Sequence, residues 1–93
     1  PGMILSNEPG YYKENEYGIR IENLVVIKEN NDKKLYFENI SWCPIDLDLI
    51  DSSMLDQIER QWLNEYHKKV YDTLEIFLEN KERDWLKKVT SEV

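Results

Sequence analysis

The chain has 93 residues, of which 41% are hydrophobic and 33% charged, and its formal net charge is −7. This length accommodates at most one independent domain with a limited core. The acidic balance excludes a nucleic-acid-binding face, because the short Lys/Arg runs have acidic neighbours. No apolar run is long enough to span a membrane, and no signal-peptide pattern is present. Cys43 is the only cysteine, which excludes an internal disulfide and favours a cytoplasmic location.

The first 40 residues have the pattern of a small antiparallel sheet. We expect strands at residues 3–6, 18–27 and 35–40, the second being the richest in β-branched residues. Residues 13–16 and 28–34 are polar and read as the turns between strands, since Asn and Asp tolerate left-handed backbone conformations.

Beyond residue 50 the hydrophobic period changes from two to 3.6, which predicts helices. Asp56 followed by Glu59 fits a helix start with a capping box, and Ser53 with Asp56 is a competing start one turn earlier. Helices are expected near residues 57–79 and 82–89, with Asn80 as a stop between them. One apolar stripe runs along the first helix through Leu55, Ile58, Trp62, Tyr66, Val70, Leu74 and Phe77. The fold class is therefore α+β, a small antiparallel sheet followed by a long amphipathic helix and a shorter C-terminal helix.

Two carboxylates stand out in the strand-forming half. Glu8 follows an apolar run, and Glu22 lies inside another, on the same strand face as Arg20. Charges inside so apolar a strand are costly unless an ion pair, hydrogen bonds or a metal offsets the lost hydration. Spacing alone leaves two interpretations open: ordinary strand-end carboxylates, with Glu22 paired to Arg20, or part of a metal site.

The identities of the residues around these glutamates add a resemblance. Residues 6–12 (SNEPGYY) and 18–23 (GIRIEN) resemble the last two metal-binding segments of the aminopeptidase P family, Xaa-Pro aminopeptidases of the pita-bread fold. Residues 58–67 (IERQWLNEYH) resemble the C-terminal extension of its longer forms. The resemblance implies that residues 1–45 end a catalytic domain and residues 46–93 form the helical extension. The start at Pro1 fits a piece of a longer parent protein.

The resemblance also implies roles for three residues. Glu8 and Glu22 correspond to two of the family's five protein ligands to a pair of divalent metal ions, expected here to be manganese, with Glu22 bridging both ions. Arg20 would orient a ligand carboxylate from behind it. The remaining ligands, two Asp and a His, have no counterpart here, and neither do the family's catalytic histidines. His67 cannot replace them, because its motif matches the extension.

Two functions follow, and the sequence leaves both open. The first is the C-terminal part of a dinuclear metallo-aminopeptidase acting on peptides with proline in second position, inactive as this chain alone. The alternative is part of a non-catalytic pita-bread protein that serves as a binding or dimerisation module. A homodimer is compatible with either, whereas nucleic acid and membranes are not expected partners.

Overall fold

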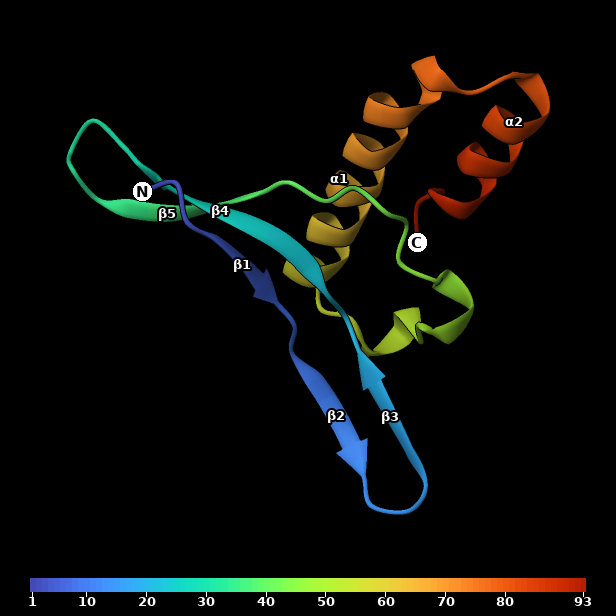
Figure 1. The fold of residues 1–93 in the computed structure, drawn as a ribbon. Helices are drawn as coiled ribbons and strands as arrows, with labels where there is room; N and C mark the ends of the chain where they lie inside the picture. The colour runs from blue at the N-terminus through green and yellow to red at the C-terminus, as the bar shows by residue number, and fades with distance from the viewer. The chain divides into compact units, whose positions relative to one another are not determined.

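A computed structural model describes all residues from Pro1 to Val93. The chain forms two compact units, residues 1–41 and residues 42–93 (Figure 1). Strands occupy the first and helices the second, which confirms the predicted α+β class. Neither helix is long and apolar enough to cross a membrane.

The first unit, here called the strand unit, contains five antiparallel strands. Strand β4 (Asn23–Glu29) lies between β1 (Ile4–Asn7) and β5 (Leu35–Asn39) in a three-stranded sheet. Strands β2 (Gly10–Lys13) and β3 (Tyr17–Arg20) pair separately as a hairpin. Residues 18–27, expected as one strand, are therefore divided between β3 and β4.

Pro9 explains why the long strand is interrupted. The Pro9 carbonyl accepts a hydrogen bond from the Ile21 N–H at 3.2 Å, but proline has no N–H to return. The register is nevertheless preserved, because Asn7 pairs with Asn23 before the gap and Gly10 pairs with Arg20 after it. The ladder thus loses regular pairing only around Glu8 and Glu22.

Both predicted turns are present, but the second is shorter than residues 28–34, because β4 runs to Glu29, and its left-handed residue is Lys33 and not Asn or Asp. Asn15 lies in the left-handed region with φ 59° in the β2–β3 turn, and Lys33 does so with φ 61° in the β4–β5 turn. In the second turn the Asn30 side chain accepts from the backbone N–H groups of Asp32 and Lys34, at 2.9 and 3.0 Å. This local bonding stabilises the tight reversal.

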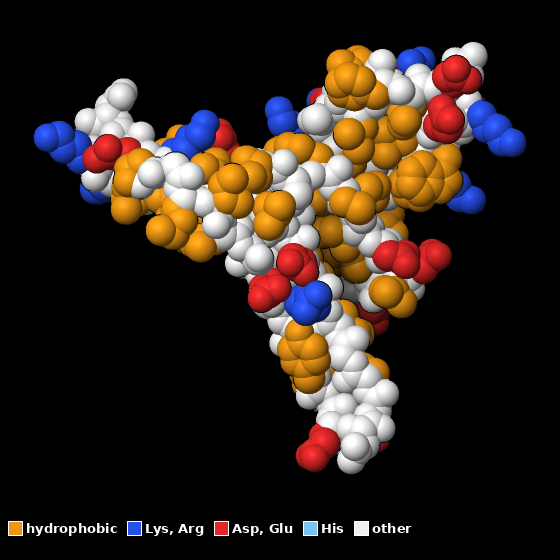
Figure 2. All heavy atoms as spheres, in the orientation of Figure 1, with side chains coloured by type: hydrophobic (Ala, Val, Ile, Leu, Met, Phe, Trp, Pro, Cys, Tyr) orange, Lys and Arg blue, Asp and Glu red, His pale blue; other side chains and the backbone are white.

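The strand unit has little core of its own. Val25 is its only buried hydrophobic residue. Figure 2 shows hydrophobic side chains at the surface along the strands. Its exposed large hydrophobic residues are Met3, Ile4, Leu5, Tyr11, Tyr12, Tyr17, Ile19, Ile21, Leu24, Leu35, Tyr36, Phe37 and Ile40.

The second unit, here called the helical unit, begins with two short 3₁₀ turns, η1 (Leu47–Leu49) and η2 (Ser52–Met54). Helix α1 (Gln57–Leu74) then starts at the predicted residue. Asp56 accepts from the Glu59 backbone N–H at 2.8 Å, and the Glu59 carboxylate accepts from the Asp56 N–H at 2.9 Å. This reciprocal capping box selects Asp56 over the competing start at Ser53.

The core of the helical unit forms between its two helices and the extended segment that precedes them. Tyr66, Val70 and Leu86 are buried at its centre. The Tyr66 hydroxyl donates to the Cys43 carbonyl at 2.6 Å, and the Ile45 N–H donates to His67 Nε2 at 3.0 Å. The rings of Trp42 and Trp62 both stack on Tyr66. Neighbouring side chains of α1 thus hold an extended segment along the helix.

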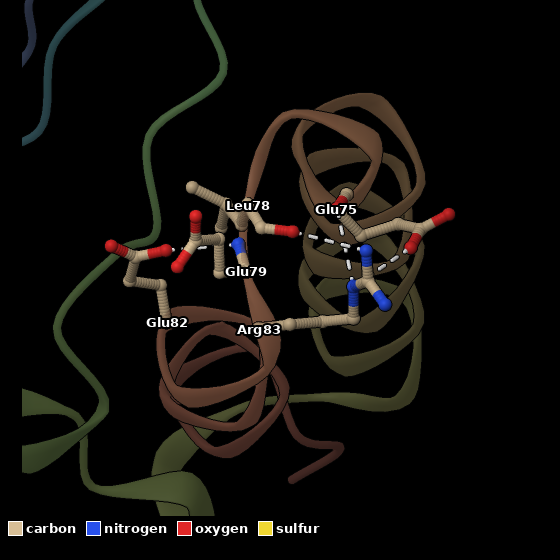
Figure 3. A network of polar contacts seen from close by, with 5 residues as sticks. All are labelled: Glu75, Leu78, Glu79, Glu82 and Arg83. Atoms are coloured by element: carbon tan, nitrogen blue, oxygen red, sulfur yellow. Dashed lines mark hydrogen bonds and ion pairs between the residues drawn. The ribbon is translucent and has the colours of Figure 1, made fainter.

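The end of α1 differs from the expectation. The helix stops at Leu74 and tightens into η3 (Glu75–Phe77), and α2 (Asn80–Val89) begins where a stop was predicted. Arg83 gives a physical reason: its guanidinium donates to the carbonyls of Glu75 and Leu78 at 3.2 and 3.0 Å, besides pairing with the Glu75 carboxylate (Figure 3). The Glu79 N–H donates to the Glu82 carboxylate at 2.9 Å, which favours a helix start there.

Candidate metal centre

Glu8 and Glu22 lie opposite each other at the break in the ladder. They are the residues next to the terminal Asn7–Asn23 pair of β1 and β4, and no residue is inserted before Gly10 pairs with Arg20. Antiparallel register therefore places the two glutamates across from one another. Opposed carboxylates repel unless a cation lies between or beside them.

Arg20 supplies part of that positive charge. Its Nε lies 3.1 Å from a Glu22 carboxylate oxygen. A hydrogen bond to the Tyr12 hydroxyl, then the charge of Glu22 and more weakly that of Glu8, raise the pKa of Arg20 above its ordinary value. The structure thus brings the three predicted site residues together. Because Arg20 and Glu22 are both substantially exposed, this ion pair alone contributes little stability.

Tyr12 belongs to the same polar group, although its hydrogen bond to Arg20 was not expected from the sequence. It pairs with Gly18 across the hairpin. A methyl group at Gly18 would lie 2.6 Å from the Tyr12 ring, and one at Gly10 would lie 2.8 Å from its hydroxyl. The two glycines therefore leave the space in which the ring lies with its hydroxyl toward Arg20. Glycine inside a strand, which indicates close approach of another group, was the available signal.

The donor set fits part of a site for hard divalent ions. Carboxylate oxygens are the ligands that Mn²⁺ and Mg²⁺ prefer, and both carboxylates leave the ladder where backbone pairing is interrupted. The chain provides only these two donors there, since no group of three or more His, Cys, Asp or Glu side chains could hold a metal ion. Further ligands would have to come from outside this chain.

His67 has a different environment. Its side chain is fully buried in the helical unit, and Nδ1 makes no hydrogen bond within the chain. Burial lowers the pKa of His67 below 6.5. The Ile45 N–H bonded to Nε2 occupies the lone pair that a second proton would need. His67 is therefore a neutral packing residue, in accordance with its sequence context.

Comparison with protein families covers nearly the whole chain. Residues 33–93 match the C-terminal region of peptidase M24, and residues 1–29 match metallopeptidase family M24. The chain belongs to metallopeptidase family M24. The glutamate pair lies in the part that matches the M24 metallopeptidase model, and both helices lie in the part that matches its C-terminal region.

Relatives of this M24 chain are named as aminopeptidases. It is 46% identical to a probable Xaa-Pro aminopeptidase P of Coprinopsis cinerea, over 99% of this chain and 16% of that protein. It is 42% identical to aminopeptidase P1 of Arabidopsis thaliana, over 98% of this chain and 15% of that protein. The chain thus spans about one sixth of the length of these curated relatives.

A solved structure gives the same result. The X-prolyl aminopeptidase of Caenorhabditis elegans matches with a TM-score of 0.77 and 32% identity, over 97% of this chain and 16% of the nematode chain. That protein is described as a cytosolic enzyme with a di-nuclear active site. The α+β architecture of this chain is therefore that of one part of an aminopeptidase of this family.

Proposed function

We propose that this chain is the C-terminal part of a dinuclear metallo-aminopeptidase, which removes the N-terminal residue from peptides with proline in second position. The observation that carries the proposal is the opposed Glu8–Glu22 pair at the ladder break, with Arg20 beside it. The names of its relatives and the di-nuclear site of the nematode enzyme support the reaction and the number of ions.

Each member of the glutamate group then has a distinct role. Glu22 would be the ligand shared by the two ions, and Glu8 would hold one of them. Arg20 neutralises part of the carboxylate charge and holds Glu22 in a fixed orientation through its 3.1 Å contact. Bound there, two divalent ions would supply a more acidic water as the nucleophile and would stabilise the negative charge that develops on the attacked carbonyl.

The chain alone is inactive under this proposal. Two carboxylates leave most coordination positions to water, and no catalytic residue is assigned within residues 1–93. The catalytic part ends at residue 45 and the helical extension begins at residue 46. The parent protein, defined as this chain joined to the upstream metallopeptidase part, carries the activity, uses manganese and resides in the cytoplasm.

The test compares the chain with its parent. We expect Glu22→Ala to abolish hydrolysis of Xaa-Pro peptides by the parent while leaving its fold intact. Glu8→Ala should first lower the affinity for one of the two ions, so that excess Mn²⁺ partly restores activity. The matched control is Glu29→Ala, a carboxylate at the far end of β4, which should leave activity unchanged.

Calorimetric titration of Mn²⁺ completes the test. The parent should bind tightly and the 93-residue chain weakly or not at all. Tight binding by the chain alone, or full activity in parent Glu22→Ala, would overturn the assignment.

A second candidate function rests on the bare surface of the strand unit. Phe37 and Tyr12 are 66% and 65% exposed, and many other large hydrophobic residues of this unit are also exposed. Such surfaces favour an interface. The alternative is therefore a non-catalytic pita-bread module that binds a partner or forms a homodimer. A parent protein that hydrolyses no Xaa-Pro peptide yet elutes as a dimer would favour this alternative.

A further inference from the structure

Ser41 occupies an unusual place directly beyond the end of β5. Its hydroxyl accepts a hydrogen bond from the Leu24 backbone N–H at 2.8 Å and lies 3.1 Å from Asn23 Oδ1, to which it donates. One hydroxyl thus contacts two consecutive residues at the beginning of β4. Ser41 is also half-buried, and its carbonyl accepts from the Asn39 side chain at 2.7 Å.

These bonds complete the β4–β5 ladder with a side chain. The last pair of the ladder is Val25 with Asn39, and the Ile40 N–H still donates to the Leu24 carbonyl at 2.9 Å. The Leu24 N–H then finds the Ser41 hydroxyl in place of a backbone carbonyl. The Leu24 N–H lies at an exposed position, whereas the bond from the Ser41 hydroxyl to the Asn23 side chain is partly buried. The hydroxyl thus supplies the acceptor that the ladder lacks at Leu24.

The location of these hydrogen bonds matters because Glu22 immediately precedes Asn23 in the chain. On one side of Glu22, the Ile21 N–H is bonded to the Pro9 carbonyl. On the other side, the backbone N–H of Leu24 and the side chain of Asn23 are both bonded to Ser41, and both residues pair with β1. Glu22 itself lies outside both strands, so its backbone direction depends on these two fixed neighbours.

We propose that Ser41 is a positioning residue for Glu22. By fixing the first two residues of β4, it fixes the direction in which the Glu22 carboxylate leaves the ladder, while Arg20 holds the carboxylate itself. This inference rests on the proposed role of Glu22 as a metal ligand. Ser41 would thus join the residues that position the site, although it follows β5 and lies 19 positions along the chain from Glu22.

The experiment measures Mn²⁺ binding to the parent protein by calorimetry, with Xaa-Pro hydrolysis as a second readout. Partners behind metal ligands typically change metal affinity by about 10–100-fold when they are removed. Ser41 acts on Glu22 only through Asn23 and Leu24, so Ser41→Ala should raise the Mn²⁺ dissociation constant measurably but by less than this factor. Hydrolysis should fall at limiting Mn²⁺ and recover toward the wild-type rate as Mn²⁺ is raised.

Two further variants test the hydroxyl itself. Ser41→Thr keeps it and should restore Mn²⁺ affinity. Ser41→Cys keeps the shape but bonds more weakly, so it should shift affinity in the same direction as Ser41→Ala by a smaller factor, and it serves if the alanine variant does not fold. The control is Ser53→Ala, because the Ser53 hydroxyl donates to Asp51 at 2.6 Å in the helical unit, away from the glutamates in sequence.

The outcomes separate this inference from the proposed function. A wild-type parent that neither binds Mn²⁺ nor cleaves Xaa-Pro peptides would overturn the proposed function and the role of Ser41 with it. An active wild type whose Mn²⁺ affinity is unchanged by Ser41→Ala and Ser41→Cys would overturn only the role of Ser41, even if the melting temperature of these variants falls.

Discussion

The two units differ in where their stability comes from. The helical unit buries side chains from α1 and α2, and its fully or nearly fully buried residues are Leu63, Tyr66, His67, Val70 and Leu86. The strand unit buries only Val25 and is organised by backbone ladders and turn residues. The unit with the candidate site is therefore the one with almost no core.

The helical unit thus provides most of the stability, whereas the strand unit carries the candidate site. Apolar burial is the main favourable contribution to folding, so the helical unit can hold its own arrangement. The strand unit instead presents Glu8, Glu22 and Arg20 on an open surface with many exposed hydrophobic residues. Such a surface fits a part that meets further protein, from which the remaining ligands would come.

The largest effect is expected when the core of the helical unit is cut. Leu86 is 1% exposed, whereas Leu35 in β5 is 60% exposed. Leu86→Ala should destabilise the chain by about 2–5 kcal/mol, because it leaves a cavity beside Tyr66 and Val70. Leu35→Ala, the matched control, should have a much smaller effect. Thermal melting followed by circular dichroism at the helix band measures both.

Equal losses of stability in the two leucine variants would contradict the comparison. They would mean that the strand unit buries Leu35 in solution, most simply through association. Light scattering on the same samples distinguishes this case, because a self-associating chain changes its apparent mass with concentration.

Local sequence signals predicted the elements well where the chemistry is local. The start of α1 at Asp56 and the turn at Asn15 both depend on residues a few positions apart. The break between β3 and β4 was not predicted, because it arises from Pro9 on the opposite strand. The tightening at Glu75 depends on Arg83, which lies in the next helix.

The candidate site shows the same limit. Motif resemblance identified Glu8, Glu22 and Arg20, and the structure brings them together. Ser41 and the bond of Tyr12 to Arg20 were not predicted, because they depend on cross-strand neighbours and not on sequence distance. Register, once known, makes both relations visible.

The second prediction concerns the corner between α1 and α2. Arg83→Ala leaves the carbonyls of Glu75 and Leu78 without the guanidinium, and hydrogen bonds to charged groups contribute about 1.5–3 kcal/mol. We expect the loss of stability to lie near the lower end of this range, since Arg83 is partly exposed and water can replace its hydrogen bonds. Arg83→Lys should recover only part of the lost stability, because an ammonium lacks the planar arrangement of N–H groups that reaches both carbonyls. Denaturant titration of the two variants measures the difference.

The third prediction uses the single histidine. Burial lowers the pKa of His67 below 6.5, so the unfolded chain binds a proton at higher pH than the folded chain does. The free energy of unfolding that depends on a neutral His67 is therefore fully present above pH 6.5. It is lost as the pH falls through the folded pKa of His67. Proton NMR titration of the only imidazole in the chain should give a pKa below that of a free histidine.

A His67 pKa at or above its ordinary value would show that the imidazole is not buried in solution as it is in the structure. His67→Gln provides the companion measurement, because the amide oxygen can still accept from Ile45 but does not titrate. Its unfolding midpoint should lose the acid-dependent decrease seen for the wild type, apart from the contribution of carboxylates.

The smallest effect is expected at the surface of the strand unit. Lys28 Nζ lies 2.6 Å from a Glu38 carboxylate oxygen across β4 and β5, and this hydrogen bond and charge raise the pKa of Lys28. Both side chains are nearly half exposed, so water and salt compete with the pair. Lys28→Met should thus change the unfolding midpoint no more than Lys34→Met, which removes a charge from the same hairpin.

Salt and pH decide whether that small effect comes from charge. At about 1 M salt the screening length falls to about 3 Å, so any difference between the two lysine variants should vanish. The sign with pH follows from the raised pKa: the pair contributes below pH 10.5, the ordinary value for lysine, and is lost as the pH rises through the folded pKa. A difference that persists in high salt would instead come from the packing of the aliphatic part of the lysine side chain on its neighbours. Side-chain packing would then contribute more to the stability of the strand unit than the exposure of its residues indicates.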